Sequence, residues 1–244
     1  MTELQIEDQG AVRLLRMNRP EKHNALNTAL TQALLDALHD ADRSGAVRAI
    51  VLAGNGKSFC AGADTREFSG LTAQHGDAVL QRAELTTELH LAFSRIGKPV
   101  VSAVQGNALG GGAGLALACD MAVMAEDVRF GYPELRHGIV AAVVMANLVR
   151  QVGRKHAFEL VAMAEPIDGA RALELGLANR VVPADRVLDS ALELARRMAG
   201  WEPAAMKLTK RSFHRSADLA LAEALAVGRD ANTIMRSFGS GGGQ

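Results

Sequence analysis

This 244-residue chain has few cysteines, no net charge and no long hydrophobic run. Its two cysteines, Cys60 and Cys119, lie far apart and form no C-x-x-C pair, which argues against a disulfide framework or a zinc site. The 27 basic and 27 acidic residues cancel, so no footprint for nucleic acid or an anionic membrane is present. No apolar run approaches the ~20 residues of a membrane span. The acidic, alternating N-terminus is unlike a signal peptide, so we expect a soluble, cytoplasmic protein.

Several common catalytic and nucleotide-binding motifs are missing as well. Gly56-Lys57-Ser58 resembles the end of a phosphate-binding loop, but that motif needs a glycine five residues earlier, where this chain has Val51. No G-x-G-x-x-G follows the first expected strand, no G-x-S-x-G elbow occurs, and no H-E-x-x-H is present. Nucleotide-binding, serine-hydrolase and metal chemistry therefore lack support.

Short apolar runs alternate with helical periodicities in the first half of the chain, which predicts parallel strands joined by helical crossovers. The expected strands lie at residues 4–8 and 12–17 (a hairpin split by Gly10), 49–53, 100–104 and 121–124. The expected helices lie at residues 30–41, with Asn27 or Thr28 as the cap, at 79–96, and directly after a glycine turn at 106–112.

Beyond residue 139 the pattern changes to almost continuous helix. The expected helical segments are 157–163, 169–175, 188–198, 204–212 and 219–235, interrupted by a strand at 179–182. The final helices are amphipathic, which suits packing either on the core or on a neighbouring subunit. We therefore predict one α/β domain with a helical C-terminal extension.

Two glycine-bearing segments, 56–67 and 106–114, each follow an expected strand. Loops at the carboxyl ends of strands are where open α/β sheets bind ligands. A helix entered through glycines leaves its first N–H groups free, and such groups can hold a negatively charged oxygen. Gly114, one helical turn further on, leaves a bare spot beside that place. The alternative is that both segments are tight turns chosen for backbone geometry alone.

The same two segments resemble the signatures of the crotonase family, the enoyl-CoA hydratases and isomerases. Ser58–Asp64 resembles [AS]-F-x-A-G-A-D, and Leu109–Asp120 resembles L-G-G-G-x-E-L-A-x-x-C-D. Three more segments resemble family motifs in the same order along the chain: Arg19–Leu26 (R-P-x-x-x-N-A-L), Arg129–Glu134 (F-G-x-P-E) and 167–182 (A-x-x-x-G-L-V-x-x-V-V). The resemblance spans residues 12–213 and implies a crotonase-like spiral of ββα repeats.

Carried over position by position, the resemblance implies an oxyanion hole made by the backbone amides of Ala63 and Gly111. These would receive the thioester oxygen of an acyl-CoA while an enolate forms. Glu134 matches one of the two catalytic glutamates of the family, and a carboxylate in an apolar pocket suits a proton shuttle. Taken without the flanking matches, Glu134 is equally a helix-start glutamate that complements a dipole.

The second family glutamate would stand at position 114, where this chain has glycine. The family's two-glutamate enzymes divide the proton transfers of 2-enoyl-CoA hydration between two side chains, whereas the single-glutamate members that this chain resembles are often Δ3 to Δ2 isomerases, though others are hydratases. We therefore expect an enoyl-CoA isomerase. The alternatives are an enoyl-CoA hydratase and a non-catalytic acyl-CoA-binding subunit. His137, three residues after Glu134, is the nearest auxiliary group, although a histidine at the pocket edge or in solvent is the simpler interpretation.

The resemblance also implies contacts to coenzyme A, which enters as part of the substrate with no other cofactor and no metal. The candidates are Lys22, Ala25, Ala61, Asp64, Thr65 and Arg66, with Asp64 expected to brace its loop by hydrogen bonds. A neighbouring subunit of a trimer or hexamer would add Lys207, Lys210, Arg211 and Phe213. We expect a core domain at 1–195, a helical trimerisation or lid segment at 196–238 and a flexible tail at 239–244.

Overall fold

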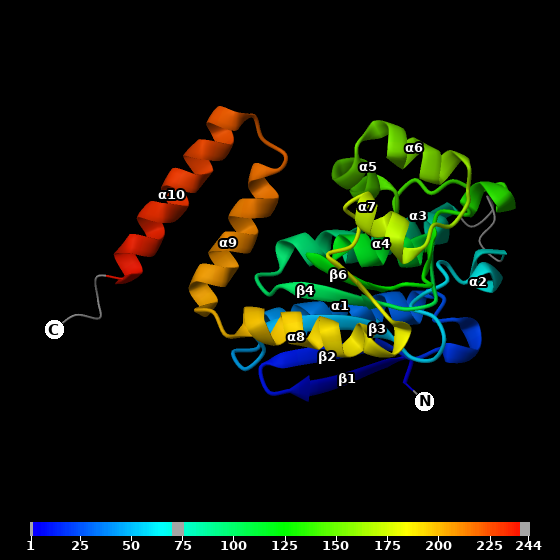
Figure 1. Ribbon diagram of the computed structural model, residues 1–244, viewed down its shortest axis with the longest axis horizontal. Helices are drawn as coiled ribbons and strands as arrows, with labels where there is room; N and C mark the ends of the chain where they lie inside the picture. The colour runs from blue at the N-terminus through cyan, green and yellow to red at the C-terminus, as the bar shows by residue number, and fades with distance from the viewer. Residues whose placement is uncertain (1, 70–75, 240–244) are drawn as a thin grey trace.

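The computed structural model describes residues 2–69 and 76–239, and its centre is a six-stranded sheet (Figure 1). Its strands, in spatial order, are β1 (Leu4–Gln9), β2 (Val12–Met17), β3 (Ala49–Gly54), β4 (Val100–Val104), β6 (Met121–Ala125) and β8 (Arg180–Val182). The β1–β2 hairpin is antiparallel, and every other neighbouring pair is parallel. Parallel pairs need crossover connections, so the predicted alternation of strands and helices is confirmed.

The sheet is covered by α1 (Thr28–Arg43), α3 (Gly76–Arg95), α4 (Gly111–Ala118) and α8 (Val187–Ala199). Helix α8 packs across β2, β3, β4 and β6, whereas α1 packs on β1, β2 and α3. All of β3 is buried, as expected for a parallel strand enclosed on both faces. Of the two expected caps of α1, Asn27 is the one observed, since its side chain accepts a hydrogen bond from the N–H of Leu30.

A second, two-stranded sheet lies beside the first. It pairs β5 (Asn107–Leu109) with β7 (Arg129–Gly131) in parallel. Neither strand was predicted from the sequence, because three residues are too few to show a strand period. This small sheet matters for the site, since α4 follows β5 and Glu134 follows β7.

The region after β7 is less helical than predicted. Glu134–His137 form a short 3-10 helix that ends at Gly138 (φ 68), and residues 139–145 form turns where continuous helix was expected to begin. The glycine ends the helix because it adopts the left-handed conformation. The helices that follow in this region include α5 (Ala146–Val152), α6 (Arg154–Ala162) and α7 (Gly169–Glu174), whereas the short α2 (Thr65–Ser69) lies earlier in the chain, before α3.

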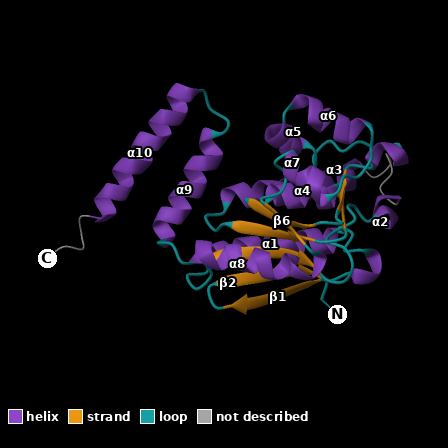
Figure 2. Cartoon of the chain, viewed as in Figure 1, coloured by secondary structure: helices purple, strands orange, loops and turns teal. Residues whose placement is uncertain are grey.

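The chain ends in α9 (Pro203–Ser216) and α10 (Leu221–Gly239), two helices that pack on each other and extend away from the sheet (Figures 1 and 2). Several of their apolar side chains are exposed, including Phe213, Leu221 and Leu225. The predicted trimerisation role of this segment stays a prediction, and the predicted tail beyond Gly239 lies outside the described residues. None of the described helices is long and apolar enough to cross a membrane.

Candidate functional site

Two backbone loops meet beside the start of α4. The N–H of Cys60 donates to the carbonyl of Asn107 (3.0 Å), and the N–H of Leu109 donates to the carbonyl of Cys60 (3.0 Å). This short parallel bridge brings Ala63 close to Gly111, because a Cβ placed on Gly111 would lie 3.8 Å from the Ala63 nitrogen. The two amides predicted to form an oxyanion hole are therefore neighbours in space.

Both amides lack an acceptor within the part of the chain that the structure describes: neither the N–H of Ala63 nor that of Gly111 donates a hydrogen bond. Gly111 is the first residue of α4, where no intrahelical acceptor exists. The glycines nearby permit the close approach of the loops. A Cβ on Gly62 (φ 95) would lie 2.8 Å from the carbonyl oxygen of Leu109, and one on Gly112 would overlap the carbonyl of Cys60. The oxyanion-hole role of the Ala63 and Gly111 amides stays a prediction. It is supported by the fact that both donors are free and lie next to each other.

Glu134 lies at the other side of this turn. The N–H of Gly110 donates to the carbonyl of Gly131 (2.8 Å), so the ends of β5 and β7 are joined just before Gly111 and Glu134. A Cβ on Gly110 would lie 2.5 Å from Oε1 of Glu134. The segment 129–134 and the glycine turn at 106–112 therefore lie together in space. The carboxylate of Glu134 and the free amides of Ala63 and Gly111 are found at this place.

Burial raises the pKa of Glu134 above its ordinary value of 4.5, since desolvation disfavours the charged form. Oε2 of Glu134 is buried and has no hydrogen-bond partner among residues 2–69 and 76–239. The hydroxyl of Tyr132, two residues earlier, is also buried and unpartnered there, and its pKa is raised by burial and by the charge of Glu134. Burying a polar atom without a hydrogen-bond partner is unfavourable in free energy. The unpartnered Oε2 of Glu134 and hydroxyl of Tyr132 are therefore consistent with a place where a ligand binds.

The bare spot predicted at Gly114 is filled. A Cβ on Gly114 would lie 2.8 Å from Cε1 of His90 and 2.9 Å from Cβ of Val144. His90 comes from α3, and its Nδ1 is buried without a hydrogen-bond partner in the described structure. No motif in the sequence connects residue 90 with residue 114, so the sequence analysis missed this histidine. His137, which it named instead, is exposed at the end of the 3-10 helix.

The six predicted CoA-binding residues lie on two adjoining segments, and Thr65 and Arg66 of the second segment begin α2. The N–H of Ala61 donates to the carbonyl of His23 (2.9 Å), which joins residues 18–27 to residues 56–67. Asp64 is buried and bonds Arg19 at 2.8 Å, and this hydrogen bond lowers the pKa of the Asp64 carboxyl. The expected loop-bracing contact of Asp64 is thus present. Solvent exposure divides the other candidates into three partly exposed residues (Lys22, Ala25 and Ala61) and two exposed ones (Thr65 and Arg66).

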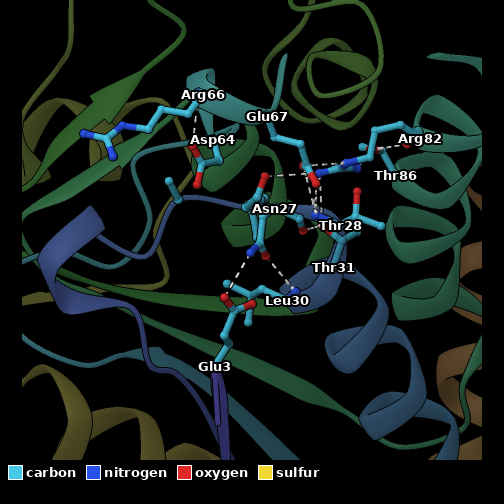
Figure 3. A network of polar contacts seen from close by, with 12 residues as sticks. Glu3, Asn27, Thr28, Leu30, Thr31, Asp64, Arg66, Glu67, Arg82 and Thr86 are labelled. Atoms are coloured by element: carbon cyan, nitrogen blue, oxygen red, sulfur yellow. Dashed lines mark hydrogen bonds and ion pairs between the residues drawn. The ribbon is translucent and has the colours of Figure 1, made fainter. Parts of the chain in front are cut away.

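A polar network holds the Ala63 loop against α1 (Figure 3). Glu67 accepts the N–H of Thr28 with both carboxylate oxygens (2.9 and 3.1 Å) and lies 3.6 Å from the guanidinium of Arg82. Arg82, buried in α3, also donates to the carbonyl of Leu26 (3.2 Å) and to the hydroxyl of Thr31 (3.0 Å). Because Leu26 bonds the backbone on both sides of Ala63, the network fixes the orientation of that amide.

One of the four residues assigned to a neighbouring subunit's site was wrongly placed. Lys210 is buried in its own chain, where its Nζ donates to Asp120 (2.7 Å) and to the carbonyl of Lys98 (2.7 Å). A lysine desolvated and paired in this way is not available to a ligand phosphate. The other three (Lys207, Arg211 and Phe213) are exposed, and their predicted role stays a prediction.

Comparisons with known proteins match nearly the whole chain. The model of the family described as enoyl-CoA hydratase/isomerase matches residues 7–237. The 2,3-dehydroadipyl-CoA hydratase of Escherichia coli is 36% identical over 236 residues, which cover 96% of this chain and 91% of that protein. An enoyl-CoA hydratase from Mycobacterium smegmatis has a structure with a TM-score of 0.91 at 31% identity, covering 95% of this chain and 90% of the other. A monofunctional enoyl-CoA isomerase from the same organism has a TM-score of 0.78 at 30% identity, covering 92% of this chain and 98% of the other.

Proposed function

This chain belongs to the enoyl-CoA hydratase/isomerase family, and from that membership we propose that it is a Δ3 to Δ2 enoyl-CoA isomerase. The amides of Ala63 and Gly111 hold the thioester oxygen. The carboxylate of Glu134 takes a proton from C2, and the electron pair moves into the thioester to give a dienolate. Glu134 then returns the proton to C4, which leaves the double bond between C2 and C3. The reaction moves one proton and needs no cofactor beyond the CoA of the substrate.

The observation that carries this proposal is the carboxylate of Glu134 beside the turn of the two free amides, with glycine at the position of the second family glutamate. Glu134 adjoins the turn at Gly110, and position 114, one helical turn along α4, has no side chain. One carboxylate can both remove and return a proton, provided that its pKa is close to the working pH. The raised pKa of Glu134 suits this task. Losing one oxyanion donor typically costs about 2.7–4 kcal/mol of transition-state stabilisation, so the paired amides matter as much as the carboxylate.

Coenzyme A would lie along the two adjoining segments that carry Lys22 and Arg66. Both side chains reach solvent, and cationic groups of this kind bind phosphate by charge-assisted hydrogen bonds. Lys22 lies near enough to Asp64 to contribute to the lowered pKa of that carboxyl. We propose Lys22 and Arg66 as phosphate contacts, with Ala25 and Ala61 lining the path between them and the amide of Ala63.

Enoyl-CoA hydration is the second candidate function. Two of the compared proteins are named as hydratases, and one is named as an isomerase. A non-catalytic acyl-CoA-binding subunit is the third, and the placement of Glu134 beside two free amides speaks against it.

The test is to give the purified protein a 3-enoyl-CoA and, separately, a 2-enoyl-CoA, and to follow both products by chromatography. We expect conversion of the 3-enoyl to the 2-enoyl thioester. Hydration of the 2-enoyl-CoA without any isomerisation would reverse the order of the first two candidates. Binding of both thioesters with no turnover of either would favour the non-catalytic subunit.

Replacing Gly110 by alanine is expected to lower kcat for isomerisation by roughly 10- to 100-fold, because misplacing a catalytic group by about 1 Å has effects of this size. The new Cβ would lie 2.5 Å from Oε1 of Glu134 and would push the carboxylate away. Gly10→Ala is the matched control, since Gly10 (φ 64) has a similar positive φ to Gly110 (φ 53) but no atom within 4 Å of the added Cβ. Equal losses in the two variants would show that backbone strain alone is responsible.

A further inference from the structure

His90 is a polar side chain at the site to which the proposed isomerisation assigns no task. It lies in α3, which packs on α4, and its ring is partly exposed while Nδ1 has no contact with solvent. Nδ1 has no hydrogen-bond partner among the residues that the structure describes. An imidazole nitrogen always donates or accepts, so leaving one buried and unsatisfied is unfavourable unless a ligand completes it.

The position of His90 relates it directly to Glu134. The first turn of α4 runs from Gly110 to Gly114, whose N–H donates to the carbonyl of Gly110 (2.9 Å). Glu134 lies against Gly110 at one end of this turn, and His90 lies against Gly114 at the other. Residues four apart on a helix are separated by about 6 Å along its axis (1.5 Å per residue). The two side chains therefore flank the turn whose first amide, that of Gly111, points out as a free donor.

His90 also has suitable chemistry for a base. Burial lowers its pKa to about 4, so the ring is neutral at pH 7 and one of its nitrogens carries a free lone pair. A neutral imidazole with this pKa is about as basic as an ordinary carboxylate, whose pKa is near 4. The site thus offers, at the place where a second carboxylate is missing, a nitrogen of comparable basicity.

We propose that His90 acts in place of the missing second carboxylate as the group that activates water, so that this chain also hydrates 2-enoyl-CoA thioesters. The proposal rests on the oxyanion site and the Glu134 role of the proposed function, and it assigns a water-activating residue to hydration, the second candidate function. His90 contacts the reacting water and is in that sense a catalytic residue.

A nitrogen of His90 takes one proton from water as the water oxygen bonds to C3. The electrons of the C2–C3 double bond pass through C2 into the thioester oxygen, which the amides of Ala63 and Gly111 hold. Protonated Glu134 then gives its proton to C2 and the thioester carbonyl re-forms. Transfer of the proton from the imidazolium to the Glu134 carboxylate, through the next water, restores both groups.

The experiment compares hydration and isomerisation rates in the wild type and in His90→Phe, which keeps a ring but removes both nitrogens. We expect the rate of hydration to fall by about 10²–10⁴-fold, the usual contribution of one general acid or base. The ratio of hydration to isomerisation should fall at least tenfold. His90→Gln, which keeps a polar group of little basicity, should behave in the same way if the phenylalanine variant folds poorly. His39→Gln, a change at an exposed histidine of α1, is the matched control.

Chemical rescue separates catalysis from packing. In His90→Ala, added imidazole should restore hydration, whereas pyrrole, a ring of the same size without a basic lone pair, should not. Equal rescue by both rings, or an unchanged ratio in His90→Phe, would overturn the role of His90. Wild-type isomerisation without any hydration would overturn this proposal and leave the proposed function standing. His90-dependent hydration without isomerisation would support this proposal and contradict the isomerase.

Discussion

Glu134→Gln is expected to lower kcat for Δ3 to Δ2 isomerisation by about 10²–10⁴-fold or more, because the amide has the shape of the carboxylate but cannot accept a proton. Substrate binding should change little, since the thioester oxygen is held by the amides of Ala63 and Gly111. The pH profile of the wild type provides a second check. The carboxylate form is the active base, so activity should fall as the pH drops through a value above 4.5, the direction in which burial moves the pKa of Glu134.

The control for this variant is Glu126→Gln, at an exposed glutamate between β6 and β7 that lies close in sequence and outside the site. Steady-state kinetics on both variants, with thermal unfolding to confirm folding, would complete the comparison. Retention of a tenth or more of the wild-type activity in Glu134→Gln would mean that another group carries the proton, and would remove the central residue of the proposed mechanism.

Asp120→Ala is expected to destabilise the protein by about 3–5 kcal/mol, the usual cost of removing one partner of a buried ion pair. Asp120 accepts hydrogen bonds from Nζ of Lys210 (2.7 Å), from Nε2 of His214 (2.9 Å) and from the N–H of Val100 (2.7 Å). The aspartate therefore joins α9 to the edge of β4. Its loss leaves the ammonium of Lys210 buried, with the carbonyl of Lys98 as its one remaining acceptor among residues 2–69 and 76–239.

Urea unfolding measures this effect, with Asp218→Ala as the matched control. Asp218 pairs with Arg150 at 2.8 Å, but both side chains are exposed, so its removal should cost less than about 1 kcal/mol. Lys210→Met in the Asp120→Ala background should recover part of the loss, because it removes the unpaired charge. A loss no larger than that of Asp218→Ala would show that solvent reaches Lys210 and that the pair does not anchor α9.

The sequence predicted the middle of the central sheet well because β3 and β4 are buried throughout and read as continuous apolar runs. The runs at 49–53 and 100–104 became β3 and β4 in this way. The β5–β7 sheet was missed because each strand has three residues and its position depends on pairing between residues 22 positions apart, such as Asn107 and Arg129. Residues 139–145 were misjudged because apolar composition alone does not distinguish a helix from irregular structure and turns.

For the site, sequence order located the Ala63 and Gly111 loops and Glu134, because each lies in a segment that resembles a family motif. Their proximity depends on the bridge between Cys60 and Ala108, which no local pattern reveals. His90 could not have been found, since it lies mid-helix with no motif and reaches the site only through the packing of α3 on α4. Lys210 was misassigned because a lysine on a helix gives no sign of the partly buried aspartate, Asp120, that it pairs with.

The packing around Gly114 determines the order in which mutations could introduce a second carboxylate at this site. A mutation to glutamate at position 114 meets two obstacles at once. The ring of His90 can rotate aside, but Cβ and the carbonyl oxygen of Val144, at 2.9 and 3.1 Å from the added Cβ, move only if the turn at 141–145 moves. Overpacking of this kind costs about 1–3 kcal/mol. The two-carboxylate arrangement is therefore more than one mutational step away, and a successful route must first remodel the 141–145 turn and only then change residue 114.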